Sequence, residues 1–124
     1  MIPKFRAWDE ETETMFDVLG FDLFDNKIWS YKQGYKLNKC TVMQSTGLLD
    51  KNGKEIFEGD IVIAWSQGVK GTFEIKRRID GLWLLYPAWK DGQFWYLAPT
   101  EDGRETIEVI GNIYENKELW EAIK

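Results

Sequence analysis

The chain contains no histidine and a single cysteine, Cys40. Without histidine, no Ser-His or Cys-His pair can form a nucleophile, and a histidine-containing zinc site is excluded. One cysteine can form neither an intramolecular disulfide nor a thiolate zinc site, and a lone cysteine is typical of a reducing cytosol. Lys39 precedes Cys40 and could lower its pKa, but the sequence favours a plain, half-buried thiol. We therefore expect neither a metal nor another cofactor.

Long apolar stretches are also missing. The longest apolar runs, IVIAW and LWLLY, are far shorter than a membrane span of about 20 residues. The N-terminal sequence MIPKFRAWDEETE has acidic residues where a signal peptide needs an apolar core. We therefore expect a cytoplasmic protein that does not contact a membrane.

The residues that are present indicate one folded domain. Hydrophobic residues make up 44% of the 124 residues and charged residues 30%, which is a globular rather than a disordered composition. The net charge of -5 gives an overall field that does not attract DNA or anionic lipid, although a local patch could do so. Aromatic residues make up 15%, with seven tryptophans, and such large flat side chains suit half-buried sheets and interfaces.

Short apolar or alternating segments, separated by turn signals, predict a mainly β (α+β) fold. The acidic segment DEETE is expected as the turn of an N-terminal hairpin, Asp25-Asn26 and Asp80-Gly81 mark further tight turns, and SQGVKG is expected as a loop. The expected strands are KFRAW, TMFDVL, KIWSY, TVMQS, DIVIAW, TFEIKRRI, LWLLYPAW, QFWYLA and TIEVIGNIY.

The C-terminal sequence ENKELWEAIK predicts a short helix with Asn116 as its N-cap. The short strands between residues 47 and 114 suggest a small SH3-like β-barrel, because such a chain must close or cover its sheet edges. We predict a single domain over residues 1–124. It could divide into an N-terminal β-hairpin lobe, residues 1–45, and the barrel with the C-terminal helix, residues 46–124.

The stretch GLLDKNGKEIFEGDIV, residues 47–62, raises the question of a phosphate loop, a calcium loop, an acid/base site or a hairpin. The spacing of Gly47 and Gly53 is one residue too long for a phosphate loop, and a strand-like segment follows instead of a helix. Counted from Asp50, Gly53 and Ile61 do not match the glycine and acid positions of a calcium loop. Both ion-binding interpretations are rejected.

Glu58 and Asp60 could share a strand face and act as an acid/base pair. The alternative, which we favour, is that they accept hydrogen bonds from backbone N–H groups at a bend around Gly59. No catalytic residue is therefore assigned.

The hairpin interpretation fits the rest of this stretch. Asn52-Gly53 is a strong signal for a two-residue type I′ turn, which would place Asp50 opposite Glu55. The residues predicted to have a structural role in turns are Asn52, Gly53, Gly59 and Asp60.

Three blocks of sequence resemble the YopX family of phage and prophage proteins. They are KFRAWDEETETMF at residues 4–16, VMQSTGLLDKNGKEIFEGDIV at residues 42–62 and EVIGNIYENKEL at residues 108–119. The chain departs from the family pattern at Lys117, where the family has proline after YEN, and this touches only the start of the helix. The resemblance implies a protein of temperate phages and prophages, mostly of Gram-positive hosts, with no established activity and no catalytic residue set.

The resemblance also implies divergent surfaces at about residues 17–41 and 63–107, where a site would lie. Within the first, NKIWSYKQGYKLNK at residues 26–39 holds lysines and aromatics but no acid. Lysines that contact phosphates and aromatics that stack on bases are how single-stranded nucleic acid is held. The alternative, which we favour, is that the aromatics enter the core and the lysines pair with the acidic hairpin. The candidate nucleic-acid contacts are Lys27, Trp29, Tyr31, Lys32, Tyr35, Lys36 and Lys39.

LLYPAWKDGQFWYL, residues 84–97, crowds aromatic side chains around one turn. In strands they cannot all point inward, so they indicate either an interface or a core with two sides. KRRI at residues 76–79 is a weaker basic spot, because alternation splits it between two faces. The candidate interface residues are Tyr86, Trp89, Phe94, Trp95 and Tyr96.

Together these features predict a non-enzymatic, phage- or prophage-encoded accessory protein in the cytoplasm of the bacterial host. It is expected to bind a host or phage protein and to form a homo-oligomer. The alternative is a nucleic-acid-binding module that uses residues 26–39. A small enzyme using Glu58 and Asp60 ranks last.

Overall fold

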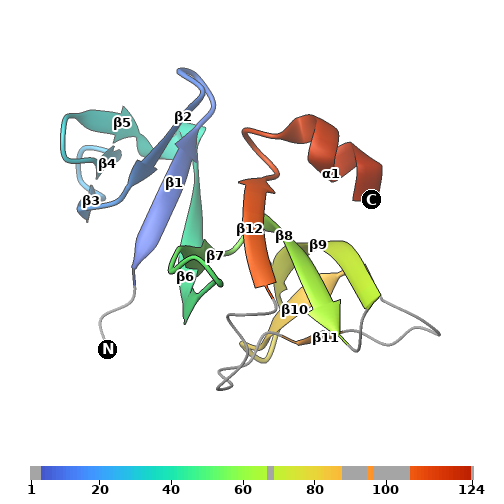
Figure 1. The fold of residues 1–124 in the computed structure, drawn as a ribbon. Helices are drawn as coiled ribbons and strands as arrows, with labels where there is room; N and C mark the ends of the chain where they lie inside the picture. The colour runs from blue at the N-terminus through green and yellow to red at the C-terminus, as the bar shows by residue number, and fades with distance from the viewer. Residues whose placement is uncertain (1–3, 67–68, 88–94, 97–106, 124) are drawn as a thin grey trace. The chain divides into compact units, whose positions relative to one another are not determined.

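The computed structural model describes residues 4–66, 69–87, 95–96 and 107–123 (Figure 1). The chain divides into two compact units, Met1–Ser45 and Thr46–Lys124. Strands predominate, and α1 (Lys117–Ile123) is the single α-helix of the described residues. None of the described helical structure is long and apolar enough to cross a membrane. The predicted mainly β fold with a short C-terminal helix is confirmed.

A hairpin begins the first unit. β1 (Phe5–Asp9) pairs antiparallel with β2 (Thr14–Asp17) on one side and with the start of β6 (Cys40–Leu49) on the other. In the turn, Glu13 has a φ of 52°, and the Asp9 carboxylate accepts a hydrogen bond from the Thr12 N–H. The acidic segment DEETE is therefore the turn that its sequence predicts.

A separate three-stranded antiparallel sheet completes the first unit, in the order β3-β4-β5 (Figure 1). Asn26, with a φ of 56°, lies in the tight turn between its first two strands, as the Asp25-Asn26 pair predicts. A 3-10 turn, Leu37–Lys39, then leads into β6. The strands of this sheet are β3 (Gly20–Asp22), β4 (Lys27–Trp29) and β5 (Gly34–Lys36).

Apolar side chains from the two sheets of the first unit pack against one another and form its core. Ala7, Phe16 and Ile28 are buried, and the ring of Tyr35 stacks on that of Phe16 with centroids 4.3 Å apart. Stacked rings of this kind contribute about 0.5–1.5 kcal/mol beyond their buried area. The partly buried residues around them are Val18, Tyr35, Leu37, Cys40 and Val42.

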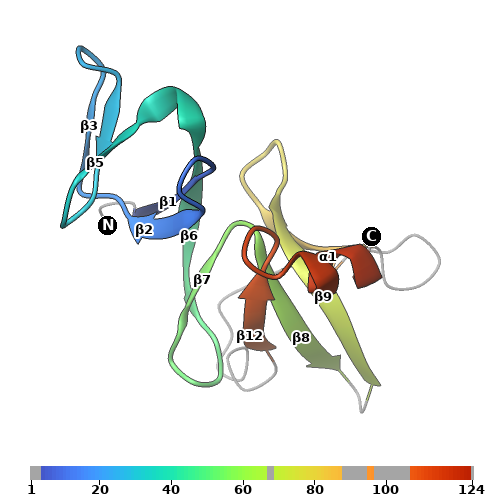
Figure 2. The same ribbon diagram turned by 90° about the horizontal axis from the view of Figure 1, so that it is seen from above.

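A curled five-stranded antiparallel sheet forms most of the second unit, in the order β11-β10-β9-β8-β12 (Figures 1 and 2). This half-barrel sheet occupies the part of the chain predicted as a small SH3-like barrel. The short strand β7 (Glu55–Phe57) follows β6 in the order β2-β1-β6-β7. The strands of the curled sheet are β8 (Asp60–Ser66), β9 (Val69–Arg77), β10 (Trp83–Tyr86), β11 (Trp95–Tyr96) and β12 (Ile107–Asn112).

Alternating residues of this sheet build the core of the second unit. On β9, Phe73 and Ile75 are buried together, and a fully buried side chain of this size contributes about 1.5–3 kcal/mol. Helix α1 lies beside β9 and β12 (Figure 2). The buried residues of this core are Ile56, Val62, Ala64, Phe73, Ile75 and Leu85.

The turn at Asn52-Gly53 differs from the predicted two-residue type I′ turn. The Asp50 N–H donates to the Lys54 carbonyl oxygen at 2.8 Å, so Asp50 lies opposite Lys54 rather than opposite Glu55. Only Gly53 has a positive φ, of 79°, whereas a type I′ turn needs a positive φ at both central residues. The loop therefore has one residue more than predicted.

Two further local predictions are corrected. Within the segment SQGVKG, Val69 begins β9 and pairs with Ser66, so the connection between β8 and β9 is shorter than the predicted loop. Asn116 precedes α1 as predicted, but its side chain does not cap the helix. Its Oδ1 accepts a hydrogen bond from the Asn112 N–H at 3.1 Å, while its carbonyl oxygen accepts one from the Leu119 N–H.

Candidate functional site

The fully buried carboxylate of Asp50 organises the stretch at residues 47–62. Its Oδ1 accepts hydrogen bonds from the N–H groups of Asn52 at 2.9 Å and Lys54 at 2.8 Å. Its Oδ2 accepts one from the Val109 N–H of β12, at 2.9 Å. Both oxygens are thus occupied by backbone donors, and this side chain holds the turn rather than a ligand.

The bend at Gly59 uses its carboxylate in the same way. Asp60 is buried, and its Oδ2 accepts a hydrogen bond from the Phe57 N–H at 2.8 Å. Gly59 has a φ of 87°, and its N–H donates to the Ile75 carbonyl oxygen of β9. This is the geometry of a structural carboxylate at a bend, which is the interpretation favoured over an acid/base pair with Glu58.

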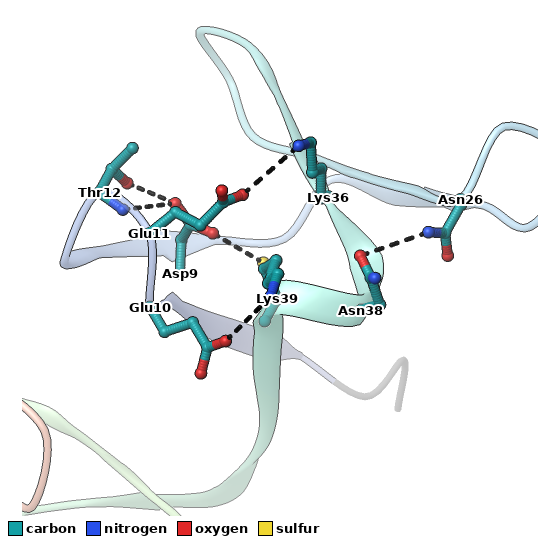
Figure 3. A network of polar contacts seen from close by, with 9 residues as sticks. Asp9, Glu10, Glu11, Thr12, Asn26, Lys36, Asn38 and Lys39 are labelled. Atoms are coloured by element: carbon teal, nitrogen blue, oxygen red, sulfur yellow. Dashed lines mark hydrogen bonds and ion pairs between the residues drawn. The ribbon is translucent and has the colours of Figure 1, made fainter.

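Two of the lysines in residues 26–39 lie beside the acidic turn between β1 and β2 (Figure 3). Lys36 Nζ lies 3.9 Å from Glu11 Oε1, and Lys39 Nζ lies 3.8 Å from Glu10 Oε1. All four side chains are substantially exposed, so these ion pairs contribute little to stability. They nevertheless place negative charge beside two of the candidate nucleic-acid contacts.

The aromatic residues of the same segment separate into two groups. Tyr35 packs into the core of the first unit against Phe16. Trp29 and Tyr31 stay exposed. Of the remaining lysines, neither Lys27 nor Lys32 forms an ion pair within the described residues. The structure therefore keeps only part of the candidate segment at the surface.

On the outer face of the β3-β4-β5 sheet, Trp29 lies between two glycines of the neighbouring strands. The strand register aligns Gly20, Trp29 and Gly34 across the three strands. A Cβ built on Gly34 would lie 3.1–3.2 Å from three atoms of the six-membered indole ring, so the ring covers Gly34 with its face. A Cβ built on Gly20 would meet no atom within 4 Å, which leaves open space on the other flank of Trp29.

The next row on this face is charged. Lys27 on β4 lies opposite both Asp22 on β3 and Lys36 on β5. These residues share the face of Trp29, because residues two apart in a strand point to the same side. The Asp22 carboxylate is turned toward its own loop, where Oδ1 accepts hydrogen bonds from the N–H groups of Phe24 and Asp25 at 3.1 Å.

A second exposed surface surrounds β3 and the turn that follows it. Leu23 is 80% exposed and Phe24 100% exposed, although both are large and apolar. Phe21 is partly covered by an edge-to-face contact with Phe5, with ring centroids 6.2 Å apart. We call this the β3 surface, and its residues are Leu19, Phe21, Leu23 and Phe24.

Of the predicted interface residues, only Tyr86 has a described side chain. The Lys76 ammonium lies 4.3 Å from the centre of the Tyr86 ring, in a cation–π contact that uses one lysine of the basic spot KRRI. In the same spot, Arg78 Nε lies 3.3 Å from Asp80 Oδ2. Trp89 and Phe94 lie outside the described residues, whereas the backbone of Trp95 and Tyr96 forms β11.

Cys40 is a half-buried thiol, as its sequence context favours. Its Sγ donates a hydrogen bond to Asp9 Oδ1, 3.7 Å away. Burial, followed by the negative charge of Asp9, raises the pKa of the Cys40 thiol to about 11. A thiol with so high a pKa is a poor nucleophile at neutral pH.

A buried carboxylate in the second unit, Glu74, is not among the residues that the sequence predicts for a site. Glu74 on β9 is 5% exposed, and its Oε1 accepts a hydrogen bond from Trp120 Nε1 of α1 at 3.0 Å. Burial raises the pKa of Glu74 above its usual 4.5, repulsion from Glu58 adds to this, and Lys76 and the Trp120 hydrogen bond oppose it. The alternation in TFEIKRRI assigns Glu74 to the face opposite Phe73, but no local signal shows that a helix covers that face.

Comparisons with known protein families and with solved structures identify relatives of this chain. The family model described as YopX protein matches residues 4–121. The chain is similar to protein EF1440 from Enterococcus faecalis, with 31% sequence identity and a TM-score of 0.56 over 96% of this chain and 98% of that one. It also shares the fold of yopX from Bacillus subtilis, with 24% identity and a TM-score of 0.62 over 94% of this chain and 96% of that one. No curated protein matches the chain.

The three blocks that carry the resemblance are architectural in this structure. Seven polar or charged residues are buried in the described ranges, and all but Glu74 fall within residues 4–16, 42–62 and 108–119. Asp50 and Asp60 hold backbone N–H groups, and Asn112 Oδ1 accepts hydrogen bonds from the N–H groups of Tyr114 and Glu115 in the loop before α1. These three segments thus specify turns and strand junctions, and by its sequence and its fold the chain belongs to the YopX family.

Proposed function

We propose that the protein is a non-enzymatic interaction module that binds a host or phage protein through the β3 surface. It acts in the cytoplasm of a bacterium that carries the phage or prophage encoding it. Members of the YopX family have no characterised activity, so this proposal depends on the surface of the molecule itself.

The concentration of exposed apolar side chains carries the proposal. Nine large hydrophobic residues are exposed in the described ranges, and the four of the β3 surface lie within residues 19–24. Scattered apolar residues are normal on a protein surface, whereas a contiguous group marks an interaction site. Aromatic side chains such as Phe24 are also enriched at protein interfaces, where they bury a large apolar area.

The carboxylates support a role without catalysis. An acid/base pair needs carboxyl groups that are available to a substrate. Asp50 and Asp60 are instead buried and accept hydrogen bonds from backbone N–H groups. Asp50 lies in the turn before β7, and Asp60 begins β8.

A pull-down from infected cells tests this function. The variant Leu23→Ser with Phe24→Ser removes the two most exposed members of the β3 surface. The matched control, Ile79→Ser with Leu82→Ser, removes two exposed apolar side chains elsewhere. We expect a protein that the native chain and the control retain but the β3-surface variant loses. Equal retention by both variants would contradict the proposal.

The same surface could also join two copies of the chain. A homo-oligomer is part of the proposal because an exposed apolar patch can pair with the same patch on a second copy about a two-fold axis. Light scattering at micromolar concentration measures the mass in solution. A monomer for the native chain would remove self-association and leave the heterologous partner.

Binding of nucleic acid is the second candidate function. It is favoured by the outer face of the β3-β4-β5 sheet, where Lys27 and Trp29 lie two residues apart on β4 and point to the same side. Two observations oppose nucleic-acid binding. Tyr35 packs into the core, and acidic side chains form ion pairs with Lys36 and Lys39.

A further inference from the structure

The geometry points to a stacking site for a nucleobase on Trp29, with the attached phosphate held by Lys27 and Lys36. The site would take one nucleotide, either free or as part of a single strand. This inference rests on the second candidate function and is independent of the β3 surface, which does not include Trp29.

The orientation of the indole supplies the stacking surface. Three atoms of its six-membered ring lie at nearly equal distances, 3.1–3.2 Å, from the Cβ position of Gly34. One ring face therefore covers the backbone of Gly34, and the opposite face points away from the sheet. Trp29 is 45% exposed, so this outward face is open to a second flat ring. Base stacking on an aromatic side chain is the principal contact of single-strand binding proteins.

The open space beside Gly20 supplies room for that ring. Gly20 is the cross-strand neighbour of Trp29, and a Cβ at Gly20 would have no atom within 4 Å. A nucleobase that is stacked on the indole can therefore extend over Gly20 without a steric clash. The two glycines therefore have different roles, since Gly34 supports the indole and Gly20 leaves the neighbouring position free.

The adjacent lysines supply the charge. Lys27 and Lys36 are direct cross-strand partners, and like charges in such a pair are unfavourable unless an anion lies between them. Glu11 Oε1 lies 3.9 Å from Lys36 Nζ. Asp22 is the other cross-strand neighbour of Lys27, but its carboxylate accepts hydrogen bonds in its own loop, and within the described residues no acid forms an ion pair with Lys27. Lys27 lies two residues from Trp29, or about 7 Å along the strand, which is within reach of the phosphate on a stacked base.

An exposed indole beside lysines favours a ligand that carries both a flat ring and a negative charge. An uncharged aromatic ring would use Trp29 but leave Lys27 without an anion, and a bare phosphate would leave the indole exposed. A base in a duplex is already stacked on both faces and cannot reach Trp29. A nucleotide with an unpaired base uses both rows of this sheet face.

Fluorescence anisotropy with a labelled oligothymidine tests the site at low salt. Gly20→Val fills the open flank with a residue that suits a strand, and it leaves Trp29 and both lysines in place. We expect Gly20→Val and Trp29→Ala each to weaken binding at least about ten-fold, whereas Trp29→Phe retains most of it. Lys27→Gln with Lys36→Gln should weaken binding more than the charge-matched control, Lys54→Gln with Lys70→Gln.

Further measurements distinguish a free nucleotide from a single strand, and nucleotide binding from protein binding at the β3 surface. Displacement of the label by thymidine monophosphate would assign a free nucleotide, and displacement only by an unlabelled oligomer would assign a single strand. Duplex that binds as well as single strand, native affinity in Gly20→Val, or no binding at low salt would each overturn the site. The variant Leu23→Ser with Phe24→Ser should bind the oligomer normally, so a failure of this site is distinct from a failure of the β3 surface.

Discussion

The side chain of Asp50 and the backbone of Val109 are joined by a hydrogen bond of 2.9 Å, although 59 residues separate them in the sequence. The first belongs to the turn before β7, and the second belongs to β12. The same carboxylate also accepts the N–H groups of Asn52 and Lys54, so one buried group fixes both the shape of the turn and its place beside the last strand. Two of the three segments that carry the family resemblance therefore meet at a single side chain.

Asp50→Asn should destabilise the second unit. An asparagine has one acceptor oxygen, so either the Val109 N–H or the N–H groups of the turn lose their partner. Each buried donor left without an acceptor costs about 1–3 kcal/mol. We expect a loss of about 1–3 kcal/mol in the free energy of unfolding, measured with urea and tryptophan fluorescence. Glu118→Gln removes an exposed charge from α1 and should change stability by less than about 0.5 kcal/mol; an equal effect of both changes would contradict this account.

Much of the fold is local enough to be predicted. The hairpin around DEETE, the Asp25-Asn26 turn and the C-terminal helix follow from turn chemistry and periodicity, which act between near neighbours in sequence. The two-residue loop at Asn52-Gly53 was wrong because the Asp50 carboxylate binds the Lys54 N–H, an interaction that turn statistics do not contain. The same carboxylate also accepts the Val109 N–H, from 59 residues away, and a contact of that range cannot be predicted from neighbouring residues.

The candidate site was likewise predictable only where it depends on residues that are close in sequence. The presence of lysines and aromatics in residues 26–39 is visible in the sequence, but their separation into core, ion pairs and surface is not. Tyr35 is lost to the core because Phe16, on another strand, stacks on it. The glycine on each side of Trp29 was overlooked because Gly20 and Gly34 come together only through the register of three strands.

Glu74→Gln should change the pH dependence of stability. Because burial raises the pKa of Glu74, the folded state binds this proton more tightly than the unfolded state does. The contribution of a protonated Glu74 is therefore complete below the unfolded pKa, near 4.5, and is lost as the pH rises through the raised folded value. Glutamine stays neutral and can still accept the Trp120 Nε1–H through its amide oxygen.

The variant should consequently gain stability relative to the native chain as the pH increases from about 4 to about 7. Urea unfolding of both proteins across this range measures the difference. Glu74→Leu separates the two roles of the side chain, because it removes the charge and also the acceptor for Trp120. A stability difference between Glu74→Gln and the native chain that is constant with pH would show that Glu74 is not the titrating group.

Cys40 should react slowly with alkylating reagents until the pH is high. With a pKa of about 11, the folded thiol has about two orders of magnitude less thiolate at neutral pH than a free cysteine. The rate of iodoacetamide alkylation, followed by mass spectrometry, should continue to rise above about pH 9 in the folded protein. In denaturant the same rate should level near the usual cysteine pKa, and the same profile in both states would refute the assignment.

Gly53→Ala tests whether the backbone conformation of the turn, rather than space, requires glycine. Gly53 has a φ of 79°, and a Cβ placed there would meet no atom within 4 Å. The cost of alanine is therefore conformational, and we expect a loss of about 1–2 kcal/mol in the free energy of unfolding. Gly53→Asn should cost less, because asparagine adopts positive φ more readily than alanine does. If asparagine and alanine destabilise the protein equally in urea unfolding, backbone conformation is not the cause, and the three-residue loop does not depend on glycine at this position.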